Sequence, residues 1–302
     1  MSTIPVFYSP KYLYTAVTSD TTTKAAAVAA SLVAQAIPNV EVKEPSRAIT
    51  VSEIALVHST EYAKAIATGS NRALADSNGL CSWTPKFASS RLWATGGVRD
   101  AVLEALRTRS NAGSMSSGLH HARYDYGNGY CTINGLAIGA RLALAAGAKR
   151  VLIVDLDAHG GGGTASLIAG VPGIEQIDVS VSSYDAYVST PQCNYTLVST
   201  ASDYLPVVRT ALTQCADPES IDLVVYNAGV DPHQDCTTGG LRGVTTEMLK
   251  ERENIVFSWA KAHNIPVAFV FAGGYLGPKL NEEALVQLHR NTIEQAALSR
   301  LN

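Results

Sequence analysis

The chain has 302 residues, of which 46% are hydrophobic and 16% are charged, a balance typical of a globular enzyme with a large buried core. Its formal net charge is −3 and its sequence pI is about 6.2. This charge argues against direct, non-specific binding to nucleic acid, because that function needs a basic face that neutralises phosphates.

The first half of the chain contains one short apolar run, followed by stretches with helical spacing. Ser59 is placed to cap a helix, Gly147 is placed to end one, and the pair Gly96-Gly97 interrupts the spacing of another. We predict, in chain order, a strand at Ile4–Tyr8 and helices at Thr22–Ala36, Thr60–Thr68, Phe87–Arg107 and Asn134–Ala146.

Short apolar runs rich in β-branched residues separate the helices of the second half. Such runs are typical of strands buried on both faces of a parallel sheet. We predict strands at Arg150–Asp155, Ile177–Val181, Leu223–Asn227 and Pro266–Phe271, and helices at Tyr204–Cys215, Thr245–His263 and Asn281–Leu301. No linker rich in Pro, Gly or Ser divides the chain. We therefore predict one α/β domain over residues 1–302, with a central, mostly parallel sheet flanked by helices.

The cysteines and the N-terminal residues bear on the subcellular location of the protein. Five cysteines occur without a CxxC pair, which favours a reduced intracellular protein over a disulfide framework. The first residues lack the basic and apolar regions of a signal peptide, and no stretch of about 20 residues stays apolar. We expect a cytoplasmic protein that does not bind a membrane; the sequence leaves its oligomeric state open.

Polar side chains follow three of the predicted strands where each strand ends. Asp155, Asp157 and His159 stand at the end of the strand that begins at Arg150. Asn227 and Asp231 stand at the end of the strand that begins at Leu223, and Tyr275 follows the strand Pro266–Phe271 and the pair Gly273-Gly274. The carboxyl ends of parallel strands meet at one edge of a sheet, where open α/β sheets bind their ligands. We expect these side chains to lie together.

The spacing of Asp157, His159 and Asp231 predicts a metal site. Residues two apart in an extended segment point the same way, so Asp157 and His159 can face one ion, with Asp231 as the third ligand. These ligands suit zinc, and iron(II) or cobalt(II) as well, and they leave the open position of a catalytic site. An Asp-x-His pattern alone is more often a capping aspartate beside an exposed histidine. Asp155 favours the metal site, because a charge that closes an apolar strand needs a partner.

A second group of residues suits proton transfer. His120 and His121 follow Gly118 in a predicted loop, and a histidine near an attacking water can take its proton and deliver it to a leaving amine. The hydroxyl of Tyr275 suits donation to a developing oxyanion. Taken singly, these patterns also fit two surface histidines and a packed tyrosine.

Four segments, in order, resemble the motifs of histone deacetylases and acetylpolyamine amidohydrolases. They are Gly118-Leu-His-His-Ala with Gly129-Tyr-Cys and Asn134, then Asp155-Leu-Asp-Ala-His, then Asn227-Ala-Gly-Val-Asp-Pro-His, and finally Ala272-Gly-Gly-Tyr. The N-terminal part, with His58 and Tyr62, is a weaker match.

The resemblance implies the fold of arginases and deacetylases and a role for each motif residue. Asp157, His159 and Asp231 would bind zinc. His121 would act as general base and then general acid, His120 would assist electrostatically while Asp155 orients it, and Tyr275 would stabilise the oxyanion. The resemblance also implies a potassium ion beneath the zinc, for which Asp155 and Ser180 are the candidate ligands.

Two positions depart from the pattern of the family. Many relatives carry a second histidine where this chain has Gly160, and Asp or Asn where it has Gly162. The carboxylate or amide at the second position supports the second tandem histidine. The chain therefore lacks the usual partner of His121, and the alternatives are an altered pKa of His121 or replacement of that partner by water or another side chain.

The sequence favours hydrolysis of an N-acetyl or other N-acyl amide of lysine, a polyamine or a small metabolite. One alternative is a catalytically silent protein that binds acyl-lysine or acyl-amines on the same fold. A second is an arginase-like ureohydrolase with two manganese ions, which would need more carboxylate ligands than these loops supply.

Overall fold

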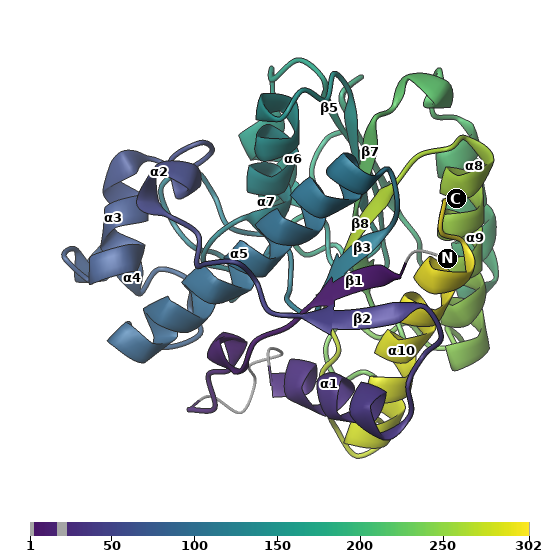
Figure 1. The fold of residues 1–302 in the computed structure, drawn as a ribbon, viewed down its shortest axis with the longest axis horizontal. Helices are drawn as coiled ribbons and strands as arrows, with labels where there is room; N and C mark the ends of the chain where they lie inside the picture. The colour runs from purple at the N-terminus through teal and green to yellow at the C-terminus, as the bar shows by residue number, and fades with distance from the viewer. Residues whose placement is uncertain (1–2, 17–22, 302) are drawn as a thin grey trace.

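The computed structural model describes residues 3–16 and 23–301, and their strands form one sheet (Figure 1). The eight strands are all parallel and lie in the order β2-β1-β3-β8-β7-β4-β5-β6. They are β1 (Ile4–Phe7), β2 (Val40–Lys43), β3 (Ala112–Ser114), β4 (Val151–Asp155), β5 (Ile174–Ser180), β6 (Cys193–Leu197), β7 (Leu223–Gly229) and β8 (Val267–Ala272).

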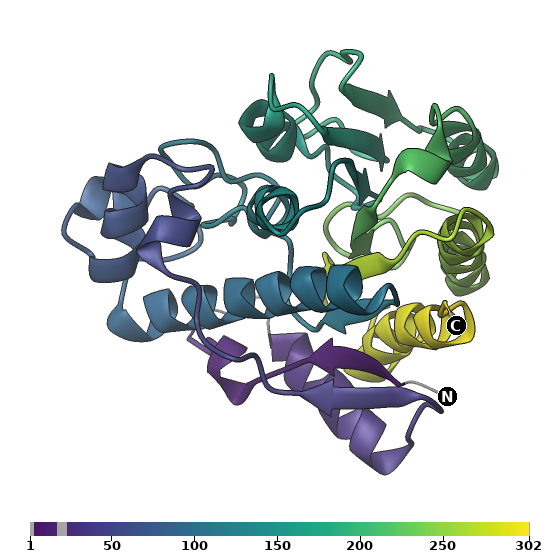
Figure 2. The ribbon, with the colours of Figure 1, turned by 45° about the horizontal axis from the view of Figure 1, so that its top comes forward.

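Helices cover both faces of the sheet (Figure 2). One face packs against α1 (Lys24–Ala34), α8 (Ala201–Thr213), α9 (Thr246–Ala262) and α10 (Glu282–Leu298), and the other against α5 (Pro85–Thr108), α6 (Gly135–Ala145) and α7 (Gly162–Ile168). The short helices α2 (Val51–Ile54), α3 (Thr60–Thr68) and α4 (Arg72–Ala75) form a group beside α5 (Figure 1). Within the described residues, none of the helices combines the length and the apolar character needed to span a bilayer.

Strand β4 shows why the predicted strands in the second half of the chain are apolar along their whole length. Leu152 and Val154 belong to the core on the side of α8, α9 and α10, whereas Val151 and Ile153 belong to the core on the side of α5 and α6. Every residue of the strand is buried. A strand covered on both faces has no solvent side, so its hydrophobicity does not alternate.

The strand order brings together three segments that are distant in the sequence. Strand β7 lies between β4 and β8, so Asp155 at the end of β4 is opposite Asn227, and Asn227 is opposite Val270. The loops after these three strands carry the predicted ligands and Tyr275. The fold therefore delivers them to one edge of the sheet.

The predicted fold class is confirmed, and each predicted element is present. Helix α3 has the predicted bounds, Thr60–Thr68, and the ends of the other elements are shifted. Thr22 lies outside the described residues; helix α1 begins at Lys24 and ends at Ala34, two residues before the predicted end. Helix α5 is longer than predicted, because Thr84 caps it and it continues through the Gly96-Gly97 pair to Thr108. Strand β5 begins at Ile174, because its backbone pairs there with Val151 of β4.

Three strands and three short helices were missed by the sequence patterns: β2, β3, β6, α2, α4 and α7. Strand β3 is the sequence Ala-Gly-Ser, which has no strand pattern and forms because β1 and β8 pair with it on either side. Strands β2 and β6 are the two partly exposed edges of the sheet, where polar residues replace the apolar run.

We predict that Phe269→Ala lowers the free energy of unfolding by about 3–5 kcal/mol, because Phe269 is fully buried in β8 and its ring packs on Phe257. The control Val33→Ala, at a position 87% exposed, should change it by less than about 0.5 kcal/mol. Urea denaturation of both variants tests this; equal stability would contradict the core described here.

Candidate active site

The candidate ligands Asp157, His159 and Asp231 converge at the carboxyl end of the sheet. One ligand atom from each lies within 4.8 Å of the other two. His159 Nδ1 lies 3.1 Å from Asp157 Oδ1 and 3.3 Å from Asp231 Oδ2. Both aspartates are buried, and the side chain of His159 is 12% exposed. The ring nitrogen of His159 thus points between two carboxylates that the solvent hardly reaches.

The donor set fits a divalent cation such as zinc. Asp231 Oδ2 is buried and accepts no hydrogen bond from any described residue, so it is free to ligate. The other oxygen, Oδ1, accepts a hydrogen bond from the backbone N–H of Ala158 at 3.0 Å, which orients the carboxylate. Two carboxylates and one imidazole make a three-ligand set with an open position.

Charges among the side chains of this cluster compensate one another. Burial opposes protonation of His159, but its hydrogen bond to Asp157 and the nearby carboxylate of Asp231 raise its pKa to about 11. Burial acts against the charge of Asp157, but His120 and His159 hold the pKa of that carboxyl well below its usual value. Burial and the neighbouring Asp157 raise the pKa of Asp231. The buried carboxylates thus favour positive charge at this point, which a bound cation would supply.

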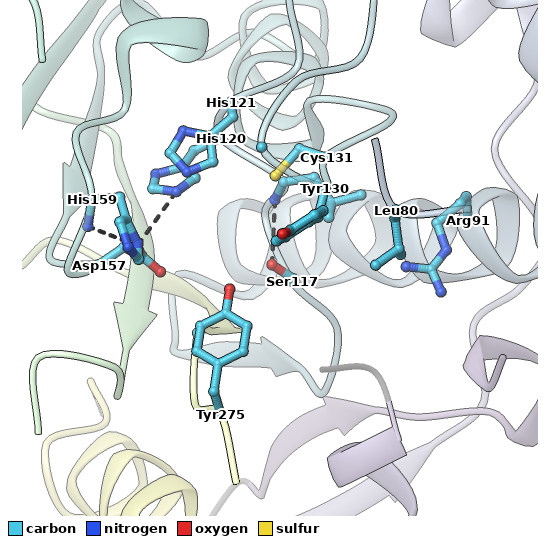
Figure 3. A pocket seen from close by; sticks show the side chains of 13 residues that line it. Leu80, Arg91, Ser117, His120, His121, Tyr130, Cys131, Asp157, His159 and Tyr275 are labelled. Carbon is cyan, nitrogen blue, oxygen red and sulfur yellow. Dashed lines mark hydrogen bonds and ion pairs between the residues drawn. The ribbon is translucent and has the colours of Figure 1, made fainter. Parts of the chain in front are cut away.

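The loop after β8 places Tyr275 opposite this cluster. Gly273 has φ of +54°, and a Cβ there would lie 2.1 Å from Cγ of Asp231, so only glycine lets the loop pass so close. The ammonium of Lys24 in α1 donates a hydrogen bond to the Gly273 carbonyl. Figure 3 shows the Tyr275 hydroxyl pointing toward Asp157 and His159. Burial raises the pKa of Tyr275, so the hydroxyl keeps its proton and can donate a hydrogen bond.

His120 is held by Asp155 from the end of β4. Its Nδ1 lies 2.8 Å from Asp155 Oδ2, and its Nε2 lies 3.5 Å from Asp157 Oδ1. Asn227 Nδ2 donates to the other oxygen of Asp155 at 2.8 Å. Burial alone would lower the pKa of His120, but Asp155 and Asp157 outweigh it and raise the pKa to about 10. Asp155, the charged residue that ends β4, is therefore paired with His120, as expected for a carboxylate at the end of an apolar strand.

His121 lies beside His120, with the two ring centroids 3.9 Å apart. Burial, together with the positive charge of His120, lowers the pKa of His121 to about 4, so its ring is neutral and able to accept a proton. Its Nδ1 lies 2.8 Å from Oδ2 of Asp185, a residue that the sequence patterns did not single out. Asp185 thus contacts His121 in place of the Asp or Asn that many relatives carry at the position of Gly162.

Helix α6 anchors the loop that carries both histidines. Asn134, its N-cap, donates from Nδ2 to the carbonyls of His120 and Ala122 at 3.2 and 3.4 Å. The backbone N–H of Asn134 donates to His58 Nε2 at 3.0 Å, and the other ring nitrogen of His58 lies 2.6 Å from the carbonyl of Arg123. His58 thus supports the loop rather than the chemistry, and burial lowers its pKa to about 4.

Two cavities meet at these residues. An outer hollow of about 460 Å³ reaches His121, His159 and Tyr275, and the other residues that line it are Ser77, Asn78, Gly79, Asn128, Gly129, Tyr130, Ser182, Tyr184 and Thr238. An inner cavity of about 40 Å³ continues past the histidines to Leu80 and Arg91, at the far end in Figure 3. A small group that reaches the cluster through the outer hollow would meet the histidines and the tyrosine together.

The candidate potassium ligands, Asp155 and Ser180, end the neighbouring strands β4 and β5. Ser180 is fully buried at the end of β5, with its Oγ 2.9 Å from the Tyr195 hydroxyl and 3.2 Å from the Ser182 carbonyl. Asp178, which the sequence patterns missed, lies opposite Asp155 in the sheet and accepts a hydrogen bond from the Gly161 N–H at 2.6 Å. Burial and Asp155 raise the pKa of Asp178.

Residues 19–290 match the family model of the histone deacetylase domain. The chain belongs to this family. An uncharacterized protein of Picosynechococcus sp. is 33% identical over 224 residues, which cover 73% of this chain and 74% of that protein. Membership of the histone deacetylase family makes the protein a deacetylase, an enzyme that hydrolyses amides.

Two crystal structures share the deacetylase fold. The HDA15 HD domain superposes with a TM-score of 0.80 at 21% identity, covering 99% of this chain and 90% of that one. An acetylpolyamine aminohydrolase from Burkholderia pseudomallei superposes with a TM-score of 0.76 at 19% identity, covering 97% of this chain and 98% of that one.

We predict that Asp231→Asn weakens zinc binding on the order of 100-fold or more, because it removes a charged ligand from a buried three-ligand set. The control Asp235→Asn changes a nearby aspartate outside the set and should leave zinc binding unchanged. Titration calorimetry on the metal-free proteins measures both affinities. Wild-type affinity in Asp231→Asn would exclude Asp231 as a ligand.

Proposed function

We propose that the protein is a zinc-dependent deacetylase in which Asp157, His159 and Asp231 bind the metal. The observation that carries the proposal is the convergence of these ligands, two histidine–carboxylate pairs and the Tyr275 hydroxyl on one pocket. Iron(II) and cobalt(II) suit the same ligands. When bound, such an ion supplies Lewis acidity toward an amide carbonyl and toward water.

His121 is the proposed general base and general acid. Its ring is neutral because burial lowers its pKa to about 4, so it can accept a proton from the attacking water. The same nitrogen then delivers that proton to the amine nitrogen as the amide C–N bond breaks. The products are a carboxylic acid and a free amine, which balances the addition of one water.

In this proposal, His120 and Tyr275 stabilise the negative charge that develops during the reaction. Burial acts against a charge on His120, but the Asp155 carboxylate, 2.8 Å from its Nδ1, raises the pKa of the ring and favours a positive charge beside the reaction. The Tyr275 hydroxyl donates a hydrogen bond to the oxygen that becomes negative when water adds to the carbonyl. We also propose Asp155 and Ser180 as ligands of a potassium ion that would stabilise the end of β4.

The outer hollow suggests the kind of amine. Among the described residues that line it, none is an aspartate or a glutamate, and Tyr130 and Tyr184 are about half exposed. Neutral side chains suit an alkyl chain, whereas a polyamine has further cationic groups for which this lining offers no carboxylate. This supports an N-acyl lysine or a neutral acylated metabolite over an acetylpolyamine.

We predict that the protein releases acetate from an acetyl-lysine peptide after zinc is added back to metal-stripped enzyme, with a higher kcat/KM than for acetylputrescine. Both substrates are assayed with and without zinc. Zinc bound in stoichiometric amount without release of any acid from a panel of acyl-lysine peptides would reject the proposal and favour a silent acyl-binding protein.

We predict that Tyr275→Phe lowers kcat on the order of 10²–10³-fold, because it removes the hydroxyl that donates to the oxyanion. Zinc content should not change, since Tyr275 is not a ligand. The control Tyr124→Phe alters a tyrosine that is 60% exposed and should keep full activity. Full activity of Tyr275→Phe would contradict the proposed oxyanion role.

A further inference from the structure

We propose that Asp185, in the loop after β5, is the positioning residue that holds His121 for proton transfer, and that Gly160 and Gly162 are glycines because this loop packs on them. The inference rests on the proposed function, in which His121 moves the proton. It assigns the His121 support to a loop that lies outside all four motif segments.

The Asp185 carboxylate is buried and held from several sides. Its side chain is 4% exposed, and Oδ2 lies 2.8 Å from His121 Nδ1. The backbone N–H of Gly163 donates to the same oxygen at 3.1 Å. The guanidinium of Arg123 pairs with Oδ1 and also donates to the Gly162 carbonyl at 2.7 Å. These contacts tie the loop, the histidine segment and the start of α7 into one network.

The contact decides which nitrogen of His121 carries the proton. An ionised carboxylate surrounded by an arginine and a backbone N–H only accepts hydrogen bonds, so the Nδ1 of His121 is the donor. The lone pair of the neutral ring is then on Nε2, on the opposite side of the imidazole. Without Asp185 the ring would be free to rotate and to change tautomer, which is how loss of an orienting carboxylate impairs other catalytic histidines.

The two glycines leave the space that the Asp185 loop fills. A Cβ on Gly162 would lie 2.5 Å from the Asp185 carbonyl oxygen, and a Cβ on Gly160 would lie 2.7 Å from the same atom. The N–H of Gly160 donates to the carbonyl of Tyr184 at 2.9 Å, which fixes the loop at this distance. Side chains at 160 and 162 are therefore incompatible with Asp185 in its present place. The glycines that depart from the family pattern and the position of Asp185 therefore depend on each other.

The backbone of Asp185 supports a specific role for this residue. Its φ is +58°, a left-handed conformation that is uncommon outside glycine but that aspartate adopts more readily than most residues. Such a conformation persists where surrounding contacts determine it. Here those contacts are the hydrogen bonds that aim the carboxylate at His121.

The test is the variant Asp185→Asn, which keeps the shape of the side chain but removes its charge. We expect kcat on an acyl-lysine peptide to fall on the order of 100-fold or more, with KM within about threefold and zinc content unchanged. Asp125→Asn, an exposed aspartate of the loop that bears His121, is the matched control and should keep full activity. Gly162→Ala retains Asp185 but displaces its loop, so it should also lower kcat without loss of zinc.

A second readout does not need activity. In ¹⁵N NMR spectra of the zinc-loaded protein, with the His121 signal assigned from His121→Gln, the wild-type ring should be the Nδ1–H tautomer and Asp185→Asn should change that signal. An active wild type with kcat of Asp185→Asn within threefold of it would overturn the inference. If the wild type shows no turnover, the proposed function fails, and an unchanged His121 signal in Asp185→Asn would then overturn the inference separately.

Discussion

The site depends on two buried carboxylates that face one imidazole. Asp157 and Asp231 come from neighbouring strands, β4 and β7, and both point at Nδ1 of His159. Two negative charges in a dry site cost several kcal/mol each unless positive charge compensates them. A divalent cation supplies this positive charge and forms bonds to the ligands. The neighbouring carboxylate of Asp155 is compensated separately, by its ion pair with His120.

Close approach of backbone segments is the second constraint, and glycine makes it possible. Gly273 lets the Tyr275 loop pass over Asp231, and Gly160 and Gly162 let the Asp185 loop approach the start of α7. In both places a missing side chain on one segment brings a functional side chain from another segment into the site. The glycines therefore belong to the active-site architecture although none of their atoms takes part in the proposed reaction.

The sequence predicts the fold class because β4, β7 and β8 are buried on both faces and read as continuous apolar runs. The convergence of Asp157, His159, Asp231 and Tyr275 follows from the parallel strand order, and the structure brings them together. Their roles stay predictions, as do the potassium site and the limits of the single domain at residues 1–302.

Other parts of the structure could not be predicted from local patterns. Strand β3 forms from Ala-Gly-Ser because its neighbours pair with it, which is a tertiary effect. Asp185 lies in a segment without periodicity, and its contact with His121 spans 64 residues of sequence. The absence of a side chain at Gly162 was the one signal in the sequence that a substitute partner for His121 was needed.

The central claim is that Asp157, His159 and Asp231 bind the catalytic metal. Anomalous diffraction at the zinc absorption edge, from crystals grown with zinc, tests it most directly. The account predicts one strong peak at about 2.0–2.2 Å from His159 Nδ1 and from one oxygen of each aspartate. Zinc bound elsewhere, with no peak between Asp157, His159 and Asp231, would contradict it.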